Sequence, residues 1–230
     1  MKRYRESSRK ATAAILPLLF LLCSIILGGN ACSRSGQPVT RTWTCMGTFA
    51  SVTVSAEEEA ALETAAALTQ ANLSDLDSRL SIFKPDSEIS RLNRSAGSSP
   101  VQVSWWTEGV LHLSMYYAAA TGGAFDPTVA PLVRFWGFNN GSQLPNVPDR
   151  VAINSVLERV GYRHLSVSNR MAFLDREGMS VDLGGIAKGY AVDVCYQALV
   201  TNDVRNVMVN LGGNIRCRGW AKPGRPWNVG

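Results

Sequence analysis

The chain has 230 residues, of which 46% are hydrophobic and 18% charged, and this composition excludes a disordered tail, a collagen-like fibre and a long coiled coil. The net charge of +5 comes mostly from basic residues at the N-terminus, because residues 33–230 hold 18 basic and 17 acidic residues. Such a nearly neutral body argues against broad binding to a phosphate backbone, so we expect no nucleic-acid partner.

The first 32 residues have the pattern of an export signal. A basic head is followed by an uncharged apolar stretch over 11–27 and by small residues that lead to Cys32. Cys32 resembles the cysteine of a bacterial lipobox, although Gly29 stands where leucine is usual. We expect a lipoprotein signal peptide over 1–32, a lipid on Cys32 and a flexible tether over 33–42. Ordinary secretion or an uncleaved anchor is the alternative.

The remaining cysteines do not form a recognisable framework. The body holds three cysteines, Cys45, Cys195 and Cys217, so they cannot all be paired in disulfides. No C-x-x-C spacing indicates a zinc site. We expect isolated buried thiols with at most one disulfide bridge.

The first half of the body predicts one strand and two helices. Alternating small and apolar residues predict a strand over 48–55. Leucines at spacings of three and four predict a helix over 57–80, and its first turn holds three glutamates. A second helix is expected over 108–120, ended by Gly122 and Gly123.

The second half predicts several short strands around one helix. The helix is expected over 186–200, and the strands over 166–175, 179–183, 206–211 and 214–218. Helices and strands follow one another without regular βαβ order, which favours an α+β fold with mixed or antiparallel sheets. Residues 219–230 read as a loop that leads into a strand.

The segment 182–193, DLGGIAKGYAVD, is the most informative one. We expect a strand that ends at Asp182. Gly184 and Gly185 are then expected to form a tight turn. A helix should follow, with Lys188 in its first turns. Glycines admit a ligand close to the backbone, and a helix start with a lysine attracts phosphate. The alternative is a glycine-rich turn with a surface lysine.

Three further segments carry weaker signals. In 122–136, GGAFDPTVAPLVRFW, the prolines indicate an ordered loop that presents Phe125 and Asp126 to a ligand or plugs the core. The segment around Met46 enters the predicted strand over 48–55. In 80–93, LSIFKPDSEISRLN, we expect a loop with an exposed Phe83, then a helical turn begun by Ser87. His112 and His164 have no neighbouring ligand pattern and are expected to be structural.

Taken in order, these motifs are more specific than each alone. The ordered set resembles the ApbE family of FAD:protein FMN transferases. Its motifs are MGT, LSxFxxxSEISRLN, GGAFDPTVAPLVxxWGF, DLGGIAKGYAVD and NLGGNIRCRG. The resemblance runs from about Cys45 to the end of the chain and implies an ApbE-like domain over 43–230.

The resemblance implies a magnesium-dependent enzyme that moves the FMN part of FAD onto a threonine or serine hydroxyl of a target flavoprotein, such as a membrane redox-complex subunit. A phosphoester bond forms and AMP is released. It also implies a location outside the cytoplasm, lipid-anchored most often to the periplasmic side of the inner membrane.

Residue by residue, the resemblance implies a set of FAD contacts and one metal ligand. The expected FAD contacts are Met46, Phe83, Ala124, Phe125, Asp126, Asp182 and Lys188. The carbonyl of Gly185 is expected to bind magnesium, which accepts backbone oxygens. No catalytic side chain is assigned.

The sequence departs from the family pattern at its end. The family's HxxDP-like segment and its D-x-x-x-T, which supplies metal ligands, do not occur before Gly230. We therefore expect a domain that lacks its C-terminal part. Two other functions stay open: an exported FAD pyrophosphatase with water as acceptor, and a non-catalytic flavin-binding lipoprotein or remnant.

Overall fold

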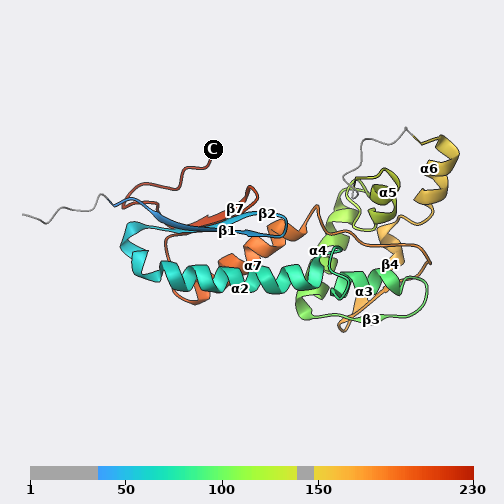
Figure 1. The fold of residues 1–230 in the computed structure, drawn as a ribbon, viewed down its shortest axis with the longest axis horizontal. Coiled ribbons are helices and arrows are strands. Elements are labelled where there is room, and N and C mark those ends of the chain that lie inside the picture. Colours follow the sequence, from blue (N-terminus) through green and yellow to red (C-terminus); the bar gives the residue numbers. More distant parts are fainter. Residues whose placement is uncertain (1–35, 139–147) are drawn as a thin grey trace, which may run out of the picture. The chain divides into compact units, whose positions relative to one another are not determined.

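Two antiparallel sheets with packed helices make up the fold, as expected for the α+β class (Figure 1). The computed structural model describes residues 36–138 and 148–230. The chain divides into Met1–Gln37 and Pro38–Gly230, and every helix and strand named below lies in the second unit. Among the described residues, no helix is long and apolar enough to cross a membrane. The predicted signal peptide and Cys32 lie outside the described residues.

The larger sheet has four strands in the order β1-β2-β6-β7, with every neighbouring pair antiparallel. The strands are β1 (Val39–Cys45), β2 (Thr48–Val54), β6 (Val207–Leu211) and β7 (Asn214–Arg218). Val52 pairs with Val209 at its centre, and both side chains are fully buried. Because side chains alternate along a strand, one face of β2 and β6 supplies the core, and the other carries both polar residues and the apolar Phe49 and Met208.

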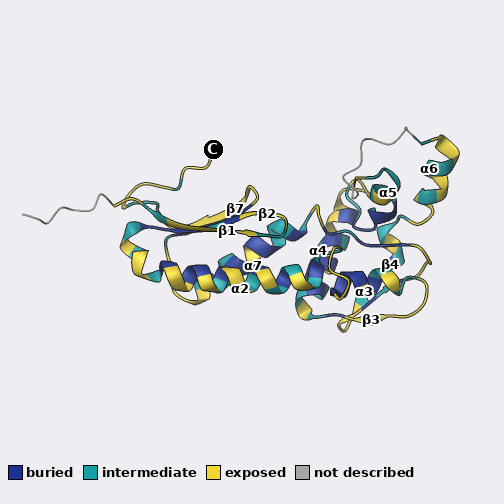
Figure 2. Cartoon of the chain, in the orientation of Figure 1, coloured by how far each residue is buried: buried dark blue, intermediate teal, exposed yellow. Residues whose placement is uncertain are grey.

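Two helices pack against this sheet, α2 (Leu62–Leu80) and α7 (Ala187–Thr201). The side chains of α2 divide into a buried and an exposed face, visible as dark and yellow bands along the helix (Figure 2). The predicted helix over 57–80 is interrupted at its start, because η1 (Ala56–Ala61) is a 3₁₀ segment in which Glu58 leaves helical geometry. The Glu58 carboxylate accepts hydrogen bonds from the backbone N–H of Arg205 and Asn206, just before β6.

The smaller sheet has the order β3-β5-β4 and packs with α3 (Glu88–Arg94) and α4 (Trp105–Ala120). Its strands are β3 (Val101–Gln102), β4 (Leu165–Ser168) and β5 (Met171–Leu174), with η2 (Tyr162–His164) just before β4. The single strand predicted over 166–175 is wrong. The chain reverses at Asn169 and Arg170, which adopt φ of 52° and 59° without any glycine to signal the turn.

Two short helices lie between α4 and η2, and the first of them falls in a segment expected to be loop. Ala130–Phe135 form α5, and Arg150–Leu157 form α6 after the segment 139–147. The expectation of loop throughout 122–136 is therefore wrong for its second half. Pro131 lies in the first turn of α5, where a missing N–H leaves no helical hydrogen bond unmade.

Two other boundaries differ from expectation. Residues 39–42, assigned to the tether, belong to β1. Residues 179–183 form no strand, and only Ser180 makes an isolated parallel bridge, to Val129. The described cysteines are all free, but only Cys195 is fully buried and Cys217 is exposed, so the expectation of buried thiols holds only in part.

Candidate functional site

Residues 182–185, here called the glycine turn, lie directly against residues 124–126, here called the AFD loop. The backbone N–H of Asp182 donates to the carbonyl of Pro127 at 2.8 Å, beside the Val129–Ser180 bridge. A Cβ on Gly185 would lie 3.2 Å from the ring of Phe125, so the ring and the glycine backbone are in close contact. Two segments that are more than fifty residues apart in sequence thus form one surface.

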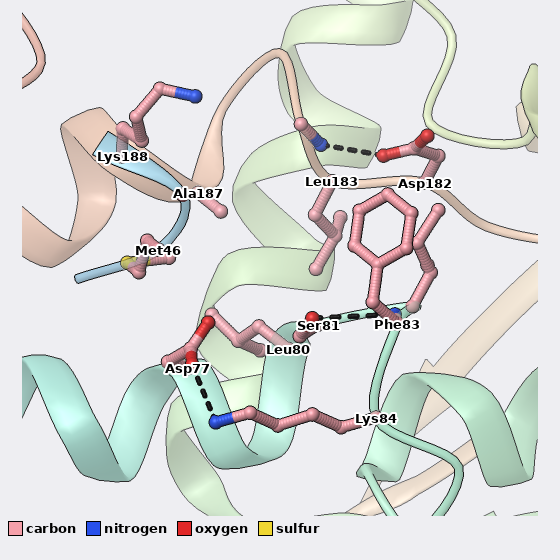
Figure 3. A pocket seen from close by; sticks show the side chains of 13 residues that line it. Met46, Asp77, Leu80, Ser81, Phe83, Lys84, Asp182, Leu183, Ala187 and Lys188 are labelled. Carbon is pink, nitrogen blue, oxygen red and sulfur yellow. Dashed lines mark hydrogen bonds and ion pairs between the residues drawn. The ribbon is translucent and has the colours of Figure 1, made fainter. Parts of the chain in front are cut away.

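The carboxylate of Asp182 shapes the turn that follows it. Its Oδ1 accepts the N–H of Gly184 at 2.8 Å, which closes a tight turn of the kind that aspartate favours (Figure 3). The chain then enters α7 at Ala187, so Lys188 is the second residue of a 15-residue helix. The helix starts where the sequence predicted it, close to the glycines.

The carboxylate of Asp126 is held by its own neighbourhood. Its Oδ1 accepts from the backbone N–H and the hydroxyl of Thr128, and its Oδ2 accepts from the N–H of Tyr162 at 2.9 Å. The Thr128 hydroxyl in turn accepts the N–H of Gly161 at 2.7 Å. These bonds fix the AFD loop against the segment before β4, and the contact of Asp126 with FAD stays a prediction.

A cavity of about 450 Å³ opens on one side of the glycine turn. Predicted site residues on its wall are Met46, Phe83, Asp182 and Lys188. Phe83 is 75% exposed at the rim, as expected, and its ring is free to stack on a planar ligand. Met46 reaches the cavity from a two-residue turn between β1 and β2 in which it adopts φ of 50°.

A second cavity, of about 550 Å³, opens beside the AFD loop. Its wall combines the apolar residues Leu132, Val133, Leu157 and Val160 with the predicted residues Ala124, Phe125, Asp126, Asp182 and Gly185. Asp182 and Gly184 line both cavities, so the two meet at the glycine turn. Asp126 and Asp182 thus line one cavity, although 182–193 and 122–136 lie far apart in the sequence.

The charges in the first cavity are arranged unevenly. Lys84 and Asp77 form an ion pair at 2.5 Å on the side opposite the turn (Figure 3). Lys188 forms no ion pair within the described part of the chain, and it lies at the start of a helix, where the backbone dipole favours anions. The cavity therefore offers a free cation beside backbone that glycines leave accessible.

One residue that positions the site was missed in the sequence. The side-chain amide of Asn93 brackets the buried backbone of Val181, donating to its carbonyl at 2.9 Å and accepting its N–H at 2.7 Å. This pair of bonds replaces the strand pairing that 179–183 lacks and fixes the residue before Asp182. The SEISRLN motif was the available signal, but a helical asparagine alone did not indicate a partner 88 positions away.

The two histidines take no part in this site. Neither His112 nor His164 lines the cavities, and His164 instead contacts the Asp175 carboxylate at 3.1 Å. Their structural role stays a prediction.

The side chains do not form a metal site by themselves. Residues 36–138 and 148–230 contain no group of three His, Cys, Asp or Glu residues placed to bind an ion. Near Gly185, the carboxylate of Asp182 is engaged with Gly184 and that of Asp126 with Thr128 and Tyr162. The described residues thus do not fit a protein-made magnesium site, and Gly185 as a ligand stays a prediction.

The comparisons with known proteins agree with the motif pattern. The model of the ApbE family matches residues 46–230. The chain belongs to the ApbE family. A FAD:protein FMN transferase of Klebsiella pneumoniae is 34% identical over 215 residues, which are 90% of this chain and 61% of that protein. A FAD:protein FMN transferase of Treponema pallidum is 32% identical and covers 93% of this chain and 62% of that protein.

The fold of this ApbE-family chain also matches solved structures. Flavin transferase ApbE from Vibrio cholerae superposes with a TM-score of 0.78 at 31% identity, covering 84% of this chain and 63% of that one. This chain therefore spans about three fifths of the length of these three relatives.

Proposed function

We propose that the protein to which this chain belongs is a FAD:protein FMN transferase. The observation that carries the proposal is the meeting of two cavities at one glycine turn, with Lys188 beside it. FAD has two planar ends joined by a pyrophosphate, and this arrangement offers one cavity to each end and a cation to the link. The names of the family relatives support the same activity.

In the proposed reaction, a threonine or serine hydroxyl of a target flavoprotein attacks the phosphorus on the FMN side of FAD. The new phosphoester bond forms, the bond from that phosphorus to the bridging oxygen breaks, and AMP leaves with that oxygen. The proton of the hydroxyl is released to the solvent. Lys188 would lower the negative charge that the pyrophosphate presents to the nucleophile, and Gly184 and Gly185 would let the phosphates approach the backbone.

Magnesium belongs to the proposal through the family resemblance. The carbonyl of Gly185 would be one ligand, and this ion usually also binds carboxylates, substrate phosphates and water. Because the described side chains complete no metal site, we assign no step of the reaction to the ion.

We further propose that the protein acts outside the cytoplasm, held by a lipid on Cys32 at the periplasmic side of the inner membrane. The basic head, apolar stretch and small residues before Cys32 support this location. A target flavoprotein exposed on the same side of the membrane would then be within reach.

A transfer assay tests the function. The protein is incubated with FAD, magnesium and a flavoprotein that carries an acceptor threonine, and the products are separated by denaturing electrophoresis. Flavin fluorescence that stays with the target, together with AMP, is the expected result. Free FMN and AMP without labelled target would indicate a pyrophosphatase, and unchanged FAD that binds to the protein would indicate a non-catalytic flavin-binding protein.

A further inference from the structure

A polar hollow of about 420 Å³ lies apart from the glycine turn. It shares no lining residue with either cavity of the proposed flavin site. Three arginines line it, Arg79 from α2, Arg91 from α3 and Arg170 from the turn between β4 and β5, together with Glu88 and the backbone around β3.

The only carboxylate on this wall is already satisfied. Glu88 is buried and accepts hydrogen bonds from Arg79 at 2.8 Å and from the N–H and hydroxyl of Ser104 at 2.7 and 2.9 Å. Arg79 also binds Asp75 at 2.9 Å. Arg79 is thus shared between Glu88 and Asp75, and both carboxylates contact Arg79 rather than the other arginines of the hollow.

The other two guanidinium groups have no carboxylate partner among the described residues. Arg91 makes one long hydrogen bond, 3.4 Å, to the carbonyl of Gln102 on the same wall. Arg170 is anchored through its backbone, which donates to Glu108 at 3.0 Å and accepts from Val103 at 2.9 Å. Two exposed guanidinium groups therefore line one hollow without an ion pair in the described part of the chain.

The backbone at Arg170 gives a second reason to regard its side chain as functional. Its φ of 59° is a conformation that glycine adopts freely and that a residue with a Cβ adopts at a cost. Glycine is the usual second residue of such a two-residue turn. An arginine at this position keeps a charge on the hollow where folding alone favours glycine.

We propose that Arg91 and Arg170 form a binding site for a phosphate group. A guanidinium group forms planar, bidentate hydrogen bonds with phosphate oxygens. Two guanidinium groups match the charge of a phosphate better than that of a single carboxylate. The phosphate belongs either to a small soluble compound or to the headgroup of a phospholipid. The site is independent of flavin transfer.

Phosphorus NMR titrations of the full chain test this site with two probes, inorganic phosphate and the water-soluble headgroup diester glycerophosphoglycerol. Arg91→Gln and Arg170→Gly should each weaken binding of the preferred probe by roughly ten-fold. Arg170→Gly also removes the steric cost of the positive φ at this position, so poor folding of the turn would not explain weaker binding by this variant. Arg94→Gln on the same helix is the matched control, because Arg94 bonds to the carbonyl of Pro85 and does not line the hollow.

The outcomes separate the alternatives. Tighter binding of the diester identifies a phospholipid headgroup, and tighter binding of inorganic phosphate identifies a soluble compound. The proposal is overturned if the wild type binds neither probe, or if both arginine variants bind as the wild type does. It is equally overturned if Lys188→Ala, rather than the arginine variants, removes the binding, because phosphate then occupies the glycine turn.

Discussion

Lys188 is the side chain that we expect to contact the pyrophosphate of FAD. It lines the first cavity, begins α7 and has no ion-pair partner among the described residues. Lys188→Ala removes one charge-assisted contact to a phosphate, worth about 1.5–3 kcal/mol, so we expect FAD affinity to fall about 10- to 150-fold. Quenching of flavin fluorescence during titration measures this affinity.

Two further variants make the Lys188 result specific. Lys188→Arg should restore only part of the affinity, because a planar guanidinium cannot replace a compact ammonium without moving the ligand. Lys222→Ala removes the same charge outside both cavities and should leave the affinity unchanged. If Lys188→Ala and wild type bind FAD equally, Lys188 is only a solvated helix residue.

Asn93 acts on the site through the backbone rather than through the ligand. Asn93→Ala breaks both hydrogen bonds to the buried Val181, so we expect a loss of about 2 kcal/mol in the free energy of unfolding. FAD affinity should fall as well, because Val181 precedes Asp182. Urea unfolding and FAD titration, measured together, check both effects.

The control for Asn93 is Asn72→Ala, which removes a local bond to Leu68 within α2 and should change neither quantity much. A purely structural role for Asn93 would reduce stability while leaving the affinity of the folded protein for FAD intact. That result would remove Asn93 from the residues that position the site.

At the scale of elements, Glu88 joins α2 to α4. It accepts from Arg79 on α2 and from Ser104, the residue that caps α4. Burial opposes the ionisation of Glu88, but hydrogen bonds from Thr107, Ser104 and Arg79 outweigh it and hold the pKa of this carboxyl below its ordinary value. The ionised form is therefore the one that stabilises the folded protein.

We expect Glu88→Gln to lower the free energy of unfolding at neutral pH by about 2 kcal/mol, less than for a fully buried ion pair because Arg79 is 34% exposed. Since the folded pKa is depressed, the contribution of Glu88 is complete above the unfolded pKa and is lost as pH falls through the folded pKa. The difference between variant and wild type in urea unfolding should thus shrink from neutral pH towards pH 3. An unchanged difference would contradict the ionic origin of the effect.

Elements with a strong internal pattern could be predicted from the sequence, and those that depend on distant partners could not. The leucine spacing of α2 and the alternation of β2 and β6 reflect their buried faces. By contrast, β1 is largely exposed and carries few apolar residues, so its pattern resembled a tether. Met179, Val181 and Leu183 are apolar and buried, but the backbone of Val181 and Asp182 bonds to Asn93 and Pro127 rather than to a strand.

In the candidate site, too, local motifs could be predicted from the sequence, and contacts with distant residues could not. Its glycine turn and AFD loop could be recognised as motifs, and the structure places both on the wall of one cavity. The internal bonds of Asp126 could not be predicted, because they depend on Tyr162 and on Thr128, which also binds Gly161. Neither could the ion pair of Asp77 with Lys84, which closes the far side of the first cavity.

For the whole molecule, the location proposed above depends on Cys32. Cys32→Ser removes the only thiol that the lipobox pattern offers, so the mature protein should lose its fatty acid and leave the membrane fraction. Mass spectrometry and membrane fractionation check this outcome. Unchanged fractionation, with no fatty acid found on the wild type, would remove the lipoprotein proposal and leave ordinary secretion or an uncleaved anchor.

The arrangement of two cavities around one turn predicts how ligands stabilise the molecule. A ligand that binds only the folded state adds about 2.7 kcal/mol at a concentration one hundred times its Kd. FAD can occupy both cavities and bring its pyrophosphate to Lys188, so it should raise the melting temperature more than FMN and AMP added together at equal concentrations. Lys188→Ala should lower the shift that FAD causes, because the pyrophosphate then loses its contact with the cation. Thermal unfolding followed by circular dichroism measures these shifts. If FMN alone stabilises the wild type as much as FAD does, one cavity holds the whole contribution and the second cavity is not part of the dinucleotide site.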